Sequence, residues 1–179
     1  MSEREQLEKI FRKHSFADFK WIDPKTIVIS QWVRMKCMFG CKEYGVKACC
    51  PPNVPSVAEC ERFFHEYAEA VIFRFEKKVK KPEDRYEWTK RINTKLLKLE
   101  REVFVAGYPK AFLLFMDTCY LCKECSGERE NCFNKQYARP APEALAVDVF
   151  STVTEVGYPI EVLSDYSESM NRYAFLMIK

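Results

Sequence analysis

The sequence has few of the residues that common enzyme motifs require. It contains five glycines and two histidines in 179 residues. Neither the P-loop nor the G-x-G-x-x-G pattern occurs in it, so a nucleotide-binding enzyme of either class is not expected. His14 and His65 lie on predicted helices without a second histidine at ligand spacing. They are predicted to have surface or capping roles, and a serine–histidine hydrolase is not supported.

The sequence also lacks a long apolar run and a large excess of one charge. No stretch approaches the roughly 18 apolar residues that predict a transmembrane helix. The first residues are charged and do not resemble a signal peptide. The net charge of +3 is small for a nucleic-acid-binding protein. We therefore expect a cytoplasmic protein of one domain, residues 1–179, that binds neither membranes nor nucleic acids.

Hydrophobic periodicity predicts helices packed on a sheet. Helices are predicted over 3–14, 56–67, 82–105 and 142–156, and strands over 26–33, 70–76, 110–117, 160–163 and 173–178. Capping-box spacing marks the first two helix starts. This order favours an α+β (or α/β) fold with a mixed four- to five-stranded sheet. Two turn-rich segments, 34–55 and 118–140, are predicted metal loops, and each follows a predicted strand.

Cysteine is abundant, with nine residues in the chain. A chain of this length buries a sufficient core without disulfides, and cytoplasmic proteins seldom contain them. Metal binding is therefore the expected role of most of these thiols, with disulfides or free thiols as alternatives. Cys60 differs because it lies near the apolar side of a predicted helix, which predicts a buried structural thiol.

The cysteines of segment 118–140 have the spacing of an iron–sulfur site. Cys119, Cys122 and Cys125 form a C-x2-C-x2-C run, and Cys132 follows after six residues. Three thiolates at this interval in a tight loop can reach one four-iron four-sulfur cluster. Zinc more often uses separated C-x2-C pairs, so zinc is the alternative metal.

The first loop contributes Cys37, Cys41 and Cys50, and Cys50 is followed by two prolines. Cysteine followed by proline closes many ferredoxin-type ligand sets. The C-x3-C start resembles the triplet of radical S-adenosylmethionine enzymes, but Tyr44 occupies the third position, so that motif is incomplete.

The number of cysteines leaves the number of metal centres open. Cys37, Cys41, Cys50, Cys119, Cys122, Cys125 and Cys132 are the seven expected ligands. They divide into four and three, which predicts two clusters, one of them with an iron that no cysteine binds. Cys49 is an alternative eighth ligand, and adjacent residues of an extended chain point in different directions, so Cys49 and Cys50 are expected to serve different centres. A single cluster with Cys50 as a remote fourth ligand is the other possibility.

Charged side chains accompany both loops. The basic residues are Arg34, Lys36, Lys42, Lys47, Lys123, Arg129, Lys135 and Arg139. They form either an ordinary solvated surface or a positive environment for a thiolate cluster, an anionic substrate or a redox partner. Asp117 precedes the cysteine run and is expected to cap the loop or orient a ligand. The lysine-rich run 77–81 is predicted to be an exposed turn.

Three segments together resemble a known family. They are RMKCMFGCKEYGVKACCPP (34–52), CYLCKEC with a later cysteine (119–132), and ARPAPEALAVDV (138–149). They are similar to a prokaryotic cysteine-rich domain of unknown function described as predicted metal-binding. The resemblance covers roughly residues 34–178. The seven expected ligands match the family pattern, Cys49 and Cys60 are additional, and Ala146 occupies a position where the family usually has glycine.

The resemblance implies metal or iron–sulfur binding and brings no established reaction. We therefore expect an iron–sulfur protein with one or two four-iron clusters and a redox or electron-transfer role in anaerobic metabolism. Its expected partner is a redox protein or a small anionic substrate. One alternative is an enzyme that uses the open three-cysteine cluster for substrate or sulfur chemistry, and another is a zinc-stabilised interaction module.

Overall fold

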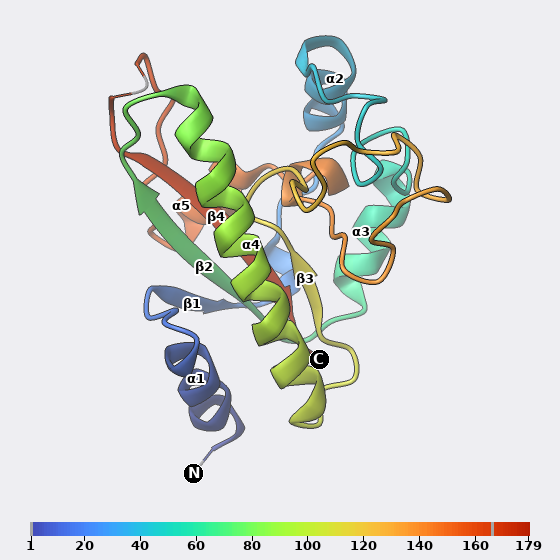
Figure 1. Cartoon of the computed structure of the whole chain (residues 1–179). Helices are drawn as coiled ribbons and strands as arrows, with labels where there is room; N and C mark the ends of the chain where they lie inside the picture. Colours follow the sequence, from blue (N-terminus) through green and yellow to red (C-terminus); the bar gives the residue numbers. More distant parts are fainter. Residues whose placement is uncertain (1, 166) are drawn as a thin grey trace.

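The computed structural model describes residues 2–165 and 167–179 and contains a four-stranded sheet with helices on both faces (Figure 1). The helices are α1 (Glu3–Lys13), α2 (Gln31–Gly40), α3 (Val57–His65), α4 (Pro82–Val105) and α5 (Val149–Glu155), with 3-10 turns η1 (Pro24–Thr26) and η2 (Pro142–Leu145). The strands are β1 (Phe19–Ile22), β2 (Ala70–Lys77), β3 (Phe112–Leu114) and β4 (Met170–Met177). The strand order is β1-β2-β4-β3, and every pairing is antiparallel.

Helices α1 and α4 cover one face of the sheet, and α4 crosses in front of it in Figure 1. Phe11 of α1 and Leu99 of α4 are fully buried against Phe73 and Leu176 of the two central strands. The rings of Phe11 and Phe73 meet edge to face, with centroids 5.2 Å apart, an arrangement that aromatic pairs prefer. These contacts make the larger of the two main apolar cores.

Helices α3 and α5 pack on the opposite face. Phe64 of α3 and Val153 of α5 are buried against Ile72 and Phe175. Successive side chains of a strand point to opposite faces, so a central strand covered on both sides needs apolar residues at consecutive positions. This explains the uninterrupted apolar runs in β2 and β4.

The α+β class and most of the predicted elements are confirmed. Helices α1, α3 and α4 and strands β2 and β4 lie close to their predicted ranges. Ser2 and Ser56 cap α1 and α3 through complete capping boxes, as their spacing predicted. In the run 77–81, the four lysines are exposed as predicted, whereas Val79 is buried and Lys77 is the last residue of β2.

The strand predicted over 26–33 is wrong. Ile29 makes only an isolated bridge with Val147, and α2 begins directly after Ser30. A short apolar run does not distinguish a strand from a helix, because both periodicities fit a few residues equally well. The first predicted metal loop, 34–55, therefore begins on a helix and not at the end of a strand.

Three further expectations need correction. The predicted helix 142–156 is divided into η2 and α5, because Ala146 between them has a left-handed φ of 62°. The segment 160–163 is not a strand, and β1 was not predicted. The sheet is wholly antiparallel and not mixed, since each pair of neighbouring strands runs in opposite directions.

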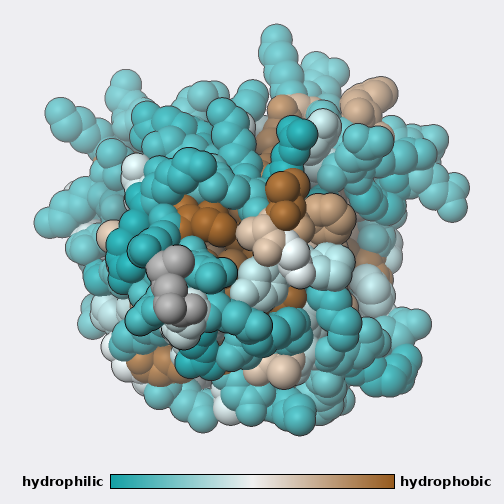
Figure 2. Space-filling model, turned by 90° about the horizontal axis from the view of Figure 1, so that it is seen from below, coloured by the Kyte–Doolittle hydropathy of each residue, from teal (hydrophilic) through white to brown (hydrophobic). Residues whose placement is uncertain are grey.

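The face of the molecule seen in Figure 2 is mostly hydrophilic, with a limited group of apolar side chains near its centre. Most large apolar side chains lie instead in the two cores on either side of the sheet. Within the described residues, no helix is long and apolar enough to cross a membrane.

The packing of α4 generates a stability prediction. Replacement Leu99→Ala should lower the free energy of unfolding by about 2–5 kcal/mol, because it opens a cavity under a fully buried side chain. Phe104→Ala on the same helix is the control, since Phe104 is 54% exposed, and should change it by less than about 1 kcal/mol. Urea unfolding measures both, and equal losses would contradict the described orientation of α4.

Candidate metal centres

Three of the expected ligands come together beside the end of α2. Cys37 lies in the last part of this helix and Cys41 follows its final residue, so the two are four positions apart, about one helical turn. Cys50 reaches the same place from the following loop, where its N–H donates to the Lys47 carbonyl at 3.0 Å. Cys37, Cys41 and Cys50 line one cavity of about 180 Å3 and are called the three-thiol site.

The other expected ligands form a second group. They are Cys119, Cys122, Cys125 and Cys132, which line one small cavity together with Cys49. Cys49 and Cys132 are buried, and Ala48 and Ala138 pack around them. These five cysteines are called the five-thiol site.

The two sites are adjacent because consecutive residues contribute to both. Cys49 faces the five-thiol cavity and Cys50 faces the three-thiol cavity. Likewise, Thr118 lines the three-thiol cavity and the next residue, Cys119, lines the five-thiol cavity. Cys49 and Cys50 therefore face different cavities, and whether they serve different metal centres stays a prediction. The structure divides the seven expected ligands into four and three.

Hydrogen bonds close the second loop and join it to the first. The Phe115 N–H donates to the Pro140 carbonyl at 2.9 Å, which closes the base of the segment 118–140. The Asn53 side-chain amide donates to the Gly127 carbonyl at 2.7 Å and to the Lys47 carbonyl at 3.4 Å. Gly127 has a φ of +80°, a conformation that glycine adopts without strain. In Figure 1 the two cysteine-bearing segments accordingly lie side by side, next to α2.

Two nitrogen donors point at sulfur atoms of the five-thiol site. The Ala48 backbone N–H donates to Cys125 Sγ at 3.3 Å, and Asn134 Nδ2 donates to Cys122 Sγ at 2.9 Å. Donors of this kind stabilise negative charge on a thiolate and tune a metal that the thiolate binds. Asn134 was not identified from the sequence, because its distance from Cys122 depends on the loop conformation.

The crowding of thiols changes their acidity. Burial, together with the neighbouring Cys41 and Cys37 thiols, raises the pKa of Cys50 to about 12. The pKa of Cys37 is raised by burial and by Cys41. Cys49 and Cys119 share a hydrogen bond, which raises the pKa of Cys49 and lowers that of Cys119. Thiolates this close repel one another unless a cation lies between them.

Carboxylates lie against the three-thiol site. Asp117 accepts a hydrogen bond of 2.7 Å from Arg85 Nε and one of 2.9 Å from the Thr118 N–H, so the predicted loop-capping role is confirmed. Glu143, from η2, also lines this cavity, and its carbonyl is 3.9 Å from Cys37 Sγ. Glu143 is exposed, and desolvation of its carboxyl by the neighbouring protein atoms raises its pKa. The sequence analysis did not single out Glu143, although Glu143 lies in the segment 138–149 that carries the family resemblance.

The basic residues of the loops have mixed roles. Arg34 donates to the carbonyls of Pro55 and Ala144, and Arg139 pairs with Glu100 at 3.0 Å, so both brace the fold. The positive charges of Lys47 and Arg129 lower the pKa values of the Cys119 and Cys49 thiols, respectively, against the larger effects described above. Lys47 and Arg129 therefore supply part of the predicted positive environment for the thiols.

The remaining candidates are structural. Cys60, on the buried side of α3, is 1% exposed and contacts the Pro55 carbonyl at 3.6 Å, as expected of a structural thiol. His14 is the C-terminal cap residue of α1 and bonds Glu102 at 2.8 Å, and His65 is exposed in the last turn of α3.

Comparison with known protein families shows the family to which this chain belongs. The family described as predicted metal-binding protein (DUF2284) matches residues 20–178. The chain belongs to this family. A search of curated proteins and a search of solved structures gave no match.

The donors of this DUF2284 protein fit a metal group that takes sulfur ligands. Eight of nine cysteines line two adjacent cavities. Within residues 2–165 and 167–179, no three Cys, His, Asp or Glu side chains are close enough to hold a single metal ion.

The contribution of the Arg85–Asp117 ion pair to stability can be measured without metal analysis. Arg85→Met should lower the free energy of unfolding by about 1–3 kcal/mol, because it leaves the largely buried Asp117 carboxylate without its charged donor. Arg101→Met, at an exposed position of the same helix, is the control. Similar chemical denaturation curves for both variants would show that the Asp117 contact contributes nothing.

Proposed function

We propose that this DUF2284 protein holds two iron–sulfur clusters side by side and acts as a cytoplasmic redox protein in anaerobic metabolism. Cys119, Cys122, Cys125 and Cys132 would bind one four-iron cluster, with Cys49 next to them. The three-thiol site would bind the other and leave one iron without a cysteine ligand. When bound, such clusters supply one-electron transfer at potentials that the surrounding protein tunes.

The single observation that carries this proposal is the adjacency of two thiol groups. The peptide bond between Cys49 and Cys50 joins residues that face different cavities. Two redox groups in these positions would be separated by little more than the width of the backbone. That arrangement suits an electron that arrives from a redox partner protein and passes from one centre to the other.

The two sites suit different parts of this task. The five-thiol cavity is small and partly buried, and the Ala48 and Asn134 donors stabilise charge on its sulfurs. A closed centre of this type favours electron transfer without ligand exchange. Lys47 and Arg129 add positive charge, which offsets the negative charge of the thiolates.

A second candidate function is catalysis at the three-thiol site. It is favoured by one observation: Cys37 and Cys41 also line a larger neighbouring cavity of about 610 Å3. A small molecule in that cavity would lie next to an iron that has no cysteine ligand. In this form of the proposal, the five-thiol site supplies electrons to the three-thiol site.

Metal analysis of anaerobically purified protein tests the proposal directly. We expect about eight iron and eight sulfide ions per chain, because each cubane cluster contains four of each. About four of each would support a single cluster. Zinc without sulfide would instead support the zinc-stabilised interaction module and contradict the redox role.

Cysteine variants test the assignment of the ligands. Cys122→Ser should remove about half of the iron and of the visible absorption, because serine is a poor substitute for a thiolate ligand. Cys37→Ser should remove the other half. Cys60→Ser is the matched control, since its hydroxyl can keep the contact with the Pro55 carbonyl, and it should retain all of the iron. Full colour in Cys122→Ser would show that the five-thiol site is assigned wrongly.

A further inference from the structure

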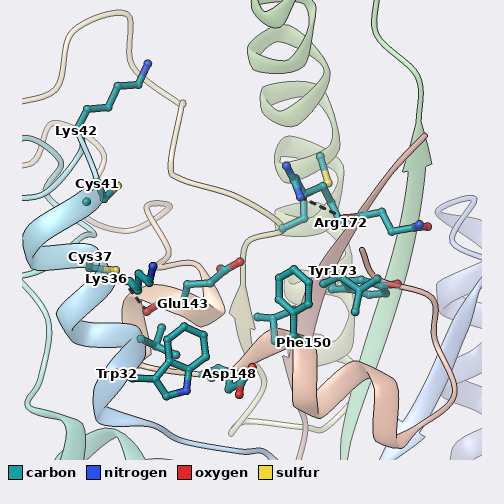
Figure 3. A pocket seen from close by; sticks show the side chains of 17 residues that line it. Trp32, Lys36, Cys37, Cys41, Lys42, Glu143, Asp148, Phe150, Arg172 and Tyr173 are labelled. Carbon is teal, nitrogen blue, oxygen red and sulfur yellow. Dashed lines mark hydrogen bonds between the residues drawn. The ribbon is translucent and has the colours of Figure 1, made fainter. Parts of the chain in front are cut away.

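The cavity of about 610 Å3 lies between α2, η2 and β4. Figure 3 shows Cys37, Lys36 and Trp32 on one side of it, and Arg172, Tyr173 and Phe150 on the other. Its volume is within the roughly 300–1,000 Å3 that small-molecule sites occupy. The cavity is therefore large enough for a metabolite, and the three-thiol site forms part of its wall.

Arg172 is the unusual residue of this cavity. Its side chain is half-buried, and its Nε is enclosed by protein without a hydrogen-bond partner. Its one hydrogen bond in the described residues is a long contact of 3.4 Å from Nη1 to the Asn171 carbonyl, and no carboxylate there forms an ion pair with it. A desolvated guanidinium without a partner is costly, and two of its N–H groups can bind a carboxylate in parallel.

The neighbouring acidic groups act on Arg172 without forming an ion pair with it in the described residues. Burial lowers the pKa of Arg172, and the positive charge of Arg85 lowers it further. Asp117 and Glu143 both act on Arg172, but Asp117 pairs with Arg85, and within the described residues Glu143 forms no ion pair with Arg172. Asp148 also lines the cavity, but it caps α5 through the Ser151 N–H and hydroxyl. Within the described residues, the cavity therefore has a guanidinium that no carboxylate binds as an ion-pair partner.

The rest of the wall is suited to an apolar body. Trp32 is 50% exposed and Phe150 is 43% exposed, although both are large apolar side chains. Tyr173 lies beside Phe150 in Figure 3. Flat aromatic side chains at the rim of a cavity favour a planar apolar ligand that would cover them.

The balance of charge limits the ligand to a small negative charge. Lys36, Lys42 and Arg172 are the cationic side chains of the lining, and Glu143 and Asp148 are the acidic ones. An excess of one positive charge matches a carboxylate better than a phosphate dianion, which the two acidic residues would repel.

We propose that this cavity binds a small carboxylic acid with a planar apolar body, whose carboxylate pairs with Arg172. The inference rests on the proposed function only in placing the bound acid beside an open iron. Cys37 and Cys41 line the same cavity, so one end of the ligand contacts the three-thiol site and the other is held by the guanidinium.

Binding is tested on the protein as purified under anaerobic conditions. The probes are benzoate, phenylacetate and indole-3-acetate, each compared with its uncharged amide. Isothermal titration measures affinity, and the fluorescence of Trp32, checked with Trp32→Phe, reports occupancy of the cavity. We expect at least one acid to bind about tenfold to a hundredfold more tightly than its amide, as a charge-assisted hydrogen bond provides.

Variants of Arg172 complete the test. Arg172→Gln should abolish the preference for the acid over the amide, and Arg172→Lys should restore part of it, because lysine keeps the charge without the planar pair of donors. Arg101→Gln, at an exposed position of α4, should bind as the native protein does. Equal affinity for acids and amides, or an unchanged preference in Arg172→Gln, would overturn the inference.

The outcome is separable from that of the proposed function. A protein with full iron content that binds none of the acids keeps its clusters and lacks this ligand site. Acid binding that depends on Arg172 in a protein without iron supports the cavity and contradicts the clusters. With both correct, the acid should also change the electron paramagnetic resonance spectrum of the native protein.

Discussion

The contact between two cysteine-bearing segments is the constraint on which the rest of the site depends. The turn around Cys49 and Cys50 packs against the segment 118–140, and neither of them contains a regular helix or strand. One amide of Asn53, one sulfur acceptor in Cys125 and the pair Cys49–Cys119 supply most of the polar links. The apolar part of this contact consists of small residues such as Ala48 and Ala138.

The sheet provides the rigid base for this contact. Strand β3 leads directly into Asp117, Thr118 and Cys119, and the hydrogen bond from Phe115 to Pro140 returns the chain to the same edge. Strand β4 places Arg172 opposite α2, where Cys37 and Cys41 lie. Both strands are held in two apolar cores, so the loops can remain irregular while their ends are fixed. A site built in this way can place sulfur, carboxylate and guanidinium groups within one small region.

Regular elements with strong periodicity were predictable, and segments stabilised by distant partners were not. Helix α4 repeats apolar residues at helical spacing along its length, and β2 and β4 each contain a continuous apolar run, over 70–73 and 173–177. The segment 26–33 has too few residues for its period to be decisive, and its backbone pairs with residues near Val147. Ala146 interrupts a helix-like pattern because its conformation is set by the packing around it, where it is fully buried.

The sequence by itself determined which residues are chemically special. The C-x2-C-x2-C run, the paired cysteines before two prolines, and the absence of nucleotide and hydrolase motifs are all local properties of the chain. Only the tertiary structure decided that Cys49 joins the five-thiol site, that Cys50 joins the other, and that Glu143 and Arg172 lie beside the three-thiol site. These placements depend on contacts between residues far apart along the chain, and local spacing carries no information about such distances.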